Sequence, residues 1–121
     1  MAEAEAWPVE IRVHREERRL GIDFDDGRSF GYPAELLRVE SPSAEVQGHT
    51  PSQKVTVGGK RRVGILRLEP VGNYAVRIVF DDGHSTGIYS WSWLYRLGAE
   101  QATIWAAYLA EIERQGLSRD G

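Results

Sequence analysis

Phe24-Asp25-Asp26-Gly27 returns later in the chain as Phe80-Asp81-Asp82-Gly83. An alternating apolar segment precedes each copy, and a short strand-like stretch and then a helix-like stretch follow it. An Asp-Gly pair between such segments is typical of a tight hairpin, because glycine adopts the positive φ that the turn requires. The sequence therefore predicts two related units, each built around one of these turns.

The first turn belongs to a predicted three-stranded meander. Val9, Ile11 and Val13 alternate with polar residues, which predicts a strand with these three side chains pointing inward. The alternation resumes over residues 20–24, and the turn then leads into a third strand. Pro33 suits the first turn of a helix, so a short helix is expected over residues 34–38.

The second turn has a similar context. Strands are predicted over residues 63–68 and 74–80, with a turn at 69–73 between them and a third strand over 85–89. Ser90 or Ser92 is expected to cap a helix over 93–97, and Gly98 is expected to end it.

A last helix is predicted at the carboxyl end, over about residues 99–116, with Gly116 as its terminator. Its apolar residues recur at three- and four-residue spacing and are expected to pack on the sheets: Ile104, Trp105, Tyr108, Leu109 and Ile112. The predicted fold class is α+β, with two related β-meander-plus-helix units of antiparallel strands and a C-terminal amphipathic helix in a single domain over 1–121.

Composition limits the kinds of protein that this chain can be. At 121 residues, with 41% hydrophobic and 27% charged residues, it has the values of one globular domain and no apolar run long enough to span a bilayer. A net charge of −3 argues against general nucleic-acid binding, which usually requires a basic excess. The amino end lacks the features of a secretory signal, so a cytoplasmic location and no membrane association are expected.

Chemical motifs are missing. The chain has no cysteine, which excludes thiolate zinc sites, cysteine nucleophiles and clusters held by its own thiolates. His14, His49 and His84 lack the spacing that would bring two imidazoles to one metal, and the paired aspartates are explained by turn chemistry. No Gly-x-Ser-x-Gly motif or complete phosphate loop occurs. We therefore predict no catalytic residue, no cofactor and no enzymatic activity.

Two segments are candidates for a binding surface. Residues 89–95 are rich in aromatic side chains, which are either mostly core or an exposed patch of the kind found at partner interfaces. The long connection from Ser41 to Gly59 contains two prolines and several hydroxyl residues, and long loops are often functional. The prediction is a partner surface that combines the aromatic segment with the loop from Ser41 to Arg62: Tyr89, Trp91, Trp93, His49, Lys60 and Arg61.

Several motifs together resemble one family. They are Trp7-Pro8-x-Glu10-Ile11, the two Phe-Asp-Asp-Gly turns, Tyr32-Pro33-Ala34-Glu35-Leu36-Leu37-Arg38, Ser41-Pro42-Ser43-Ala44-Glu45-Val46-x-Gly48-His49 and Glu69-Pro70-Val71-Gly72-Asn73-Tyr74-Ala75. In these motifs, over about residues 7–97, the chain resembles the gamma-butyrobetaine hydroxylase-like N-terminal domain family. The resemblance implies an α+β domain that occurs alone in bacteria, at the front of gamma-butyrobetaine and trimethyllysine dioxygenases, and attached to P-loop ATPases of iron–sulfur cluster assembly.

The resemblance also implies a zinc site that this chain has lost. In the dioxygenases the domain resembles a zinc module held by a Cys-x-Cys-x-x-Cys run and a later histidine, and these positions fall here at Ser41, Ser43, Val46 and His84. Neutral serine is a poor zinc ligand and valine is none, so no metal is expected at this degenerate site. After Leu97 only one further helix is predicted, so the catalytic domain of the dioxygenases is not expected here and hydroxylase activity is not transferred.

Three functional hypotheses remain. The first is a non-catalytic binding module with a protein partner. The second, drawn from the family's fusions, is a metal-handling or docking accessory in iron–sulfur cluster or iron-enzyme maturation, with an iron–sulfur assembly ATPase or an iron-dependent oxygenase as partner. The third is a small-molecule-binding protein, which would need a pocket with convergent polar groups.

Overall fold

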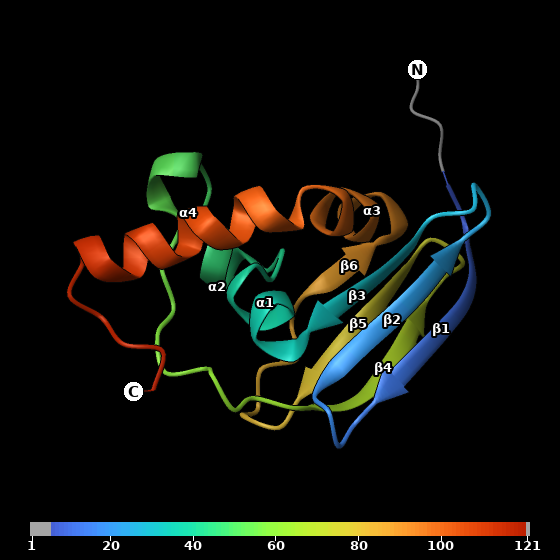
Figure 1. The fold of residues 1–121 in the computed structure, drawn as a ribbon, viewed down its shortest axis with the longest axis horizontal. Coiled ribbons are helices and arrows are strands. Elements are labelled where there is room, and N and C mark those ends of the chain that lie inside the picture. Colours follow the sequence, from blue (N-terminus) through green and yellow to red (C-terminus); the bar gives the residue numbers. More distant parts are fainter. Residues whose placement is uncertain (1–5, 121) are drawn as a thin grey trace.

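The computed structural model describes residues 6–120, with helices gathered on one side and two antiparallel sheets on the other (Figure 1). One sheet has the order β1-β2-β3 and the other β4-β5-β6. The strands are β1 (Pro8–His14), β2 (Arg19–Phe24), β3 (Ser29–Pro33), β4 (Ile65–Val71), β5 (Ala75–Phe80) and β6 (Ile88–Ser90). The helices are α1 (Ala34–Val39), α2 (Ala44–Gln47), α3 (Trp91–Ala99) and α4 (Gln101–Arg114), with a 3-10 turn η1 (Pro51–Gln53). The predicted α+β fold of two meander-plus-helix units and a C-terminal helix is confirmed.

The two Asp-Asp-Gly turns form as predicted. The Phe24 amide donates to the Arg28 carbonyl at 2.8 Å, and the Phe80 amide donates to the His84 carbonyl at 3.0 Å. Gly27 and Gly83 have φ values of 90° and 93°, which an L side chain rarely adopts. The hairpin interpretation of the repeated motif therefore holds at both positions.

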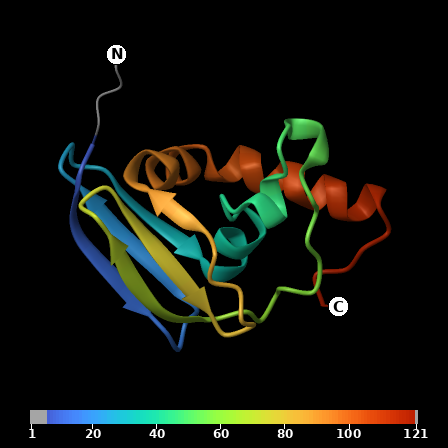
Figure 2. The same ribbon diagram turned by 180° about the vertical axis from the view of Figure 1, so that it is seen from behind.

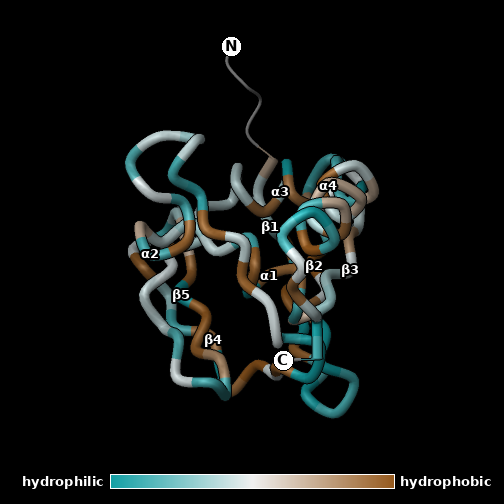
Figure 3. Tube along the Cα trace, turned by 90° about the vertical axis from the view of Figure 1, so that its left-hand side faces the viewer, coloured by the Kyte–Doolittle hydropathy of each residue, from teal (hydrophilic) through white to brown (hydrophobic). Residues whose placement is uncertain are grey.

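The two sheets share one hydrophobic core. One sheet lies behind the other in Figure 1, and Figure 2 shows the same pair from the opposite side. Buried residues of both sheets and of helices α1 and α3 belong to a single cluster, which includes Ile22, Phe24, Leu37, Ile78, Phe80 and Leu94. Figure 3 shows the hydrophobic stretches of β5 and α1 that contribute to it. Neither unit encloses a core alone.

The first strand differs from its predicted pattern. Ile11 and Val13 are half-buried, but Val9 is 65% exposed. The register between β1 and β2 shifts between Pro8 and Glu10, and such an irregularity ends the simple alternation of faces. The expectation that Val9 points inward is wrong for this reason.

The strand that we predicted over 63–68 continues through residues predicted as a turn. β4 runs from Ile65 to Val71, and the reversal occurs at Gly72, which has a φ of 55°. Pro70 is tolerated within the strand because β4 is an edge strand, where a missing amide leaves no partner unsatisfied.

The C-terminal helix packs on the sheet core only through its first half. Tyr108 and Ile112 are buried with Val39 of α1 in a second apolar cluster, against which Val57 of the long connection also packs. Leu109, expected on the same stripe, is 37% exposed. Ile104 and Trp105, nearer the start of α4, pack against the core that the sheets share, and Gln101 donates to the Gly31 carbonyl of β3 at 2.9 Å. Gly116, with a φ of 69°, follows the end of the helix as predicted.

Candidate functional site

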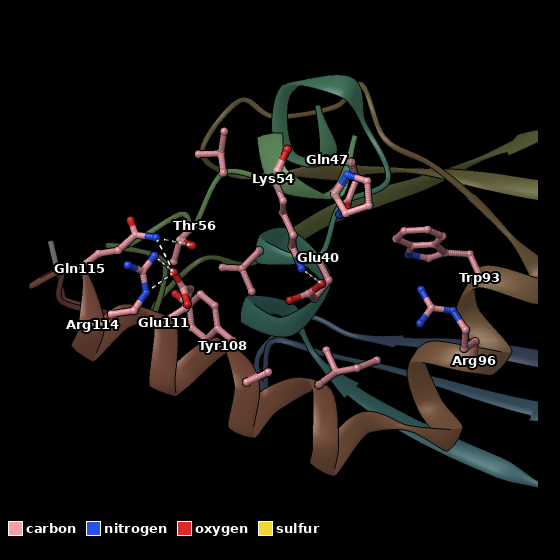
Figure 4. A pocket seen from close by; sticks show the side chains of 16 residues that line it. Glu40, Gln47, Lys54, Thr56, Trp93, Arg96, Tyr108, Glu111, Arg114 and Gln115 are labelled. Atoms are coloured by element: carbon pink, nitrogen blue, oxygen red, sulfur yellow. Dashed lines mark hydrogen bonds and ion pairs between the residues drawn. The ribbon is translucent and has the colours of Figure 1, made fainter. Parts of the chain in front are cut away.

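A cavity of about 580 Å³ lies between α4, the carboxyl end of α1, the start of α3 and the segment 51–56 of the long connection. Figure 4 shows side chains from these elements converging on it. Small-molecule sites typically have volumes of about 300–1,000 Å³. Three basic and two acidic side chains line the cavity, although the chain as a whole has a net charge of −3.

Trp93 and Arg96 form one end of the cavity. They lie three residues apart on α3, so they share a face of the helix, and both extend toward the middle of the cavity in Figure 4. The guanidinium carbon of Arg96 lies 5.1 Å from the centre of the Trp93 ring. The indole Nε1 of Trp93 is shielded from solvent and has no hydrogen-bond acceptor among the described residues. Leaving such a donor unpaired costs about 1–3 kcal/mol.

The Trp93 position is set by the start of the helix. Ser90 is the N-cap residue of α3, and its hydroxyl accepts a hydrogen bond from the Trp93 amide at 3.1 Å. A serine at this position satisfies one of the free amides of the first helical turn, as predicted. The cap therefore fixes where the indole leaves the helix.

Glu40 and Lys54 form an ion pair in the wall of the cavity. Glu40 follows α1 and is only 7% exposed, whereas Lys54 comes from the connection. Their Oε1 and Nζ atoms are 2.6 Å apart (Figure 4). A buried carboxylate needs such a partner, because an unpaired charge in a protein interior is costly.

Helix α4 supplies the remaining polar groups. Tyr108 donates from its hydroxyl to the Val57 carbonyl at 2.7 Å, and burial raises its pKa to about 12. Hydrogen bonds from Arg114 and Gln115 lower the pKa of Glu111 to about 2. Gln115 also donates to the Thr56 hydroxyl at 3.1 Å, which ties the connection to the helix.

Three of the four positions implied as a degenerate zinc site converge. The Nε2 atom of His84 lies 3.0 Å from the Ser41 hydroxyl and 3.4 Å from the Ser43 hydroxyl. Val46, which replaces the third cysteine, is buried in the following helix α2. Within residues 6–120 there is no group of three or more histidine, aspartate or glutamate side chains placed to hold a metal ion. Burial, together with the nearby Arg38 charge, lowers the pKa of His84.

Glu45, His84 and Ser41 follow one another in the acid–histidine–serine order of a hydrolytic triad. The Oε1 atom of Glu45 lies 3.3 Å from Nδ1 of His84, whose other ring nitrogen faces Ser41. A nucleophile must reach its substrate, but Ser41 is 0% exposed and its hydroxyl lies directly against the backbone of Gly87. The arrangement therefore holds the connection against the second turn and offers no open site.

The residues predicted as a partner surface do not form one patch. Tyr89 is fully buried and donates to the Leu37 carbonyl at 2.6 Å, so its place on an exposed surface is corrected. Trp91 is half-buried and donates to the Asn73 carbonyl at 2.9 Å, beside the β4–β5 turn. Trp93 is also half-buried, and it is the member of this set that lines the cavity.

The other three predicted residues lie along the connection. His49 is exposed, and its backbone amide donates to the Gln53 side chain at 2.8 Å. Lys60 pairs with Asp82 at 2.6 Å, and Arg61 pairs with Asp120 at 2.5 Å. Both basic side chains are thus engaged within the chain and lie outside the cavity lining.

Sequence reasoning missed most of the cavity. Glu40, Lys54, Arg96, Tyr108 and Glu111 belong to no motif, and four separate elements bring them together. The one usable signal was the pairing of an aromatic-rich segment with a long connection, which located Trp93 and the neighbourhood of residues 51–56.

The family profile described as "Gamma-butyrobetaine hydroxylase-like, N-terminal" matches residues 11–95. The chain belongs to this family. No curated protein matches the chain.

Solved structures agree with this assignment. Two chains, each described as an NMR solution structure, share 43% and 45% identity with this chain and cover 97% and 98% of it, and 92% and 90% of their own lengths, with TM-scores of 0.83. A crystal structure of a DUF971-family protein of unknown function from Acidithiobacillus ferrooxidans is 40% identical, with a TM-score of 0.64, and covers 77% of this chain and 93% of its own length. In residues 6–120, no helix combines the length and the apolar character needed to cross a membrane.

Proposed function

We propose that the chain is a non-catalytic binding module that holds a protein partner against the cavity between α3, α4 and residues 51–56. The main support for the proposal is that Trp93 and residues 51–56 of the connection line the same cavity of about 580 Å³. Tryptophan and arginine are the residues most often found as energetic anchors of interfaces, and both lie at its edge.

The surroundings of the cavity support a partner-binding role. Val55 is 49% exposed on the connection and lines the cavity together with Ile104 of α4. Charged side chains line the same cavity, and an apolar centre with a polar rim is the usual anatomy of an interface. The buried Ser41–His84 arrangement lends no support to catalysis, because a substrate has no access to it.

The partner class comes from the family resemblance. Fusions of this domain to iron–sulfur assembly ATPases and to iron-dependent oxygenases favour a docking role beside such an enzyme. The second candidate, a small-molecule-binding protein, is favoured by the cavity volume. A screen for ligand-induced thermal stabilisation separates the two, since a ligand that binds only the native state raises the melting temperature.

The test of the main proposal is retention of partners from native host lysate by two matched variants. Val55→Glu places a charge beside the cavity, and Leu66→Glu places the same charge on β4, at a residue of nearly equal exposure (47%). The proposal expects a specific protein to be retained by the wild type and by Leu66→Glu, to be lost from Val55→Glu, and to bind the purified wild type directly. Equal retention by both variants, or no specific partner, would contradict it.

A further inference from the structure

The charged side chains of the cavity are already paired within the chain. Three ion pairs account for the charged residues of the lining: Glu40 with Lys54 at 2.6 Å, Glu111 with Arg114 at 2.9 Å, and Arg96 with Glu100, which stands outside the lining, at 3.5 Å. A charged group that entered the cavity would compete with one of these pairs and would gain no free counter-ion.

The loss of water makes a charged occupant still less favourable. An ion that leaves water needs a partner and further hydrogen bonds to offset the lost hydration. The Trp93 Nε1 donor does not provide one, because the atom is buried and an entering group does not reach it. The electrostatics of the cavity therefore favour an uncharged occupant.

The open part of the lining is largely apolar. Val55 of the connection is 49% exposed. On α4, Ala107 is exposed and Ile104 is half-buried, and their spacing of three residues places them on one face of the helix. An occupant that covers these side chains removes apolar surface from water, which is favourable without any charge.

We infer that the cavity receives one large, uncharged apolar side chain of the partner protein, which packs between Val55 of the connection and Ile104 and Ala107 of α4. This inference rests on the proposed function and adds the chemistry that the partner presents. The paired charges then form the rim around the inserted side chain. A few side chains inserted into desolvated pockets commonly supply most of the binding energy of an interface.

The experiment follows the methyl signals of ¹³C-labelled protein. The neutral probe is N-acetyl-phenylalanine N-methylamide, and its 4-carboxy and 4-aminomethyl derivatives carry a negative and a positive charge on the same ring. We expect saturable movement of the Val55 and Ile104 signals with the neutral probe. Both charged probes should bind about tenfold more weakly, because each loses hydration without gaining a free counter-ion.

Leu109 provides the control signal. It is 37% exposed on the same helix but lies outside the lining of the cavity. Its methyl signals should stay in place while those of Val55 and Ile104 move, since a probe that attaches to any exposed apolar side chain would move all three.

Two neighbouring alanines of α4 provide matched variants. Both are exposed, but Ala107 lines the cavity, whereas Ala106 lies outside its lining. Ala107→Phe fills the cavity from its own helix and should weaken binding of the neutral probe about tenfold or more, because the new ring takes the place of the probe. Ala106→Phe should bind the probe as the wild type does. Thermal unfolding of both variants checks that each remains folded.

Three results would overturn the inference: no movement of the Val55 and Ile104 signals, equal binding of the neutral and charged probes, or equal losses in the two alanine variants. Failure of the proposed function is a separate result. A partner that is lost from Val55→Glu but binds Ala107→Phe as tightly as the wild type would keep the binding module and overturn the apolar side chain. Probe binding without any specific partner would instead contradict the proposed function, and with it the partner as the source of that side chain.

Discussion

The two halves of the molecule use the same turn but surround it differently. In both, the side chain of the second aspartate accepts from the amide two residues later at 3.0 Å, and the first aspartate exchanges hydrogen bonds with an edge-strand segment, Trp7 in one half and Gly64 in the other. After the turn, however, Arg28 is exposed, whereas the His84 side chain is only 6% exposed. The two turns therefore share their hydrogen bonds, but the residues that follow them differ in burial.

Two matching hydrogen bonds also connect the halves. Tyr32 of β3 donates to the Leu94 carbonyl in α3, and Tyr89 of β6 donates to the Leu37 carbonyl in α1, both at 2.6 Å. Each tyrosine belongs to one half and its acceptor to the helix of the other. This exchange explains why the two sheets have one common core.

The halves differ most in the segments that come after their helices. Helix α1 leads into the long connection, and α3 leads into α4. The cavity lies where these two additions meet α3, with Glu40 and Lys54 on the side of the connection, Tyr108 from α4 and Arg96 from α3. The comparison indicates that the candidate site forms only where the unmatched segments cover the repeated scaffold.

The largest effect on the free energy of unfolding is expected where an ion pair joins the carboxyl end to the first half. Glu35 of α1 is 5% exposed, and the Arg119 guanidinium donates to both of its carboxylate oxygens at 2.7 and 2.9 Å. Arg119→Met should lower the free energy of unfolding by about 3 kcal/mol, because it leaves a buried carboxylate without its partner. Denaturant unfolding measures the loss.

The control is the double variant Glu35→Gln with Arg119→Met. It should recover a large part of the loss, since the buried charge is removed with its partner. A double variant as unstable as Arg119→Met would show that the tail acts through packing on Trp105, over which the guanidinium also lies at 5.2 Å.

An intermediate effect on the free energy of unfolding is expected at the two tyrosines that connect the halves. Tyr32→Phe and Tyr89→Phe each leave a buried carbonyl without its donor, and each should cost about 1–3 kcal/mol of unfolding free energy. Because the two bonds are equal in length and burial, the two costs should agree within about 0.5 kcal/mol. A large loss from only one of the variants would break the equivalence of the halves.

The smallest effect on stability is a pH dependence that arises from Asp82 in the second turn. Burial opposes ionisation of Asp82, but hydrogen bonds from Lys60, the His84 amide and Arg38 outweigh it and lower its pKa from the ordinary value of 3.8 to about 2. The folded pKa lies below the unfolded one, so Asp82 stabilises the fold above about pH 4 and loses this contribution as the pH falls toward 2.

Asp82→Asn should therefore be less stable than the wild type near neutral pH, and the difference should shrink on acidification toward pH 2. Thermal unfolding at a series of pH values gives both curves. A difference that stays constant with pH would mean that the asparagine acts through geometry rather than through charge.

The sequence predicted the parts of the fold that depend on local rules. The glycines at positive φ, the Ser90 cap and the alternating strands all follow from backbone geometry within a few residues. The register shift that exposes Val9 and the extension of β4 through Pro70 depend on pairing with another strand, which no local pattern contains. Strand ends were accordingly the weakest prediction.

The candidate site was predictable only in part. An aromatic-rich segment beside a long connection pointed to Trp93, but the same reasoning placed Tyr89 at the surface, although its hydroxyl has a buried acceptor in another element. The Glu40–Lys54 pair joins residues from two elements whose approach depends on how α4 and the connection pack. Tertiary packing, rather than any motif, creates the cavity.

The most direct test of the comparison is photo-crosslinking from two positions in the native host. A benzophenone amino acid replaces Val55 beside the cavity in one strain and Leu66 on the repeated scaffold in the other, since the two side chains are almost equally exposed. The account predicts a specific crosslinked partner from position 55 and none from position 66. The same partner captured with equal yield from position 66, or from that position alone, would contradict the claim that the binding site lies at the cavity beside the long connection.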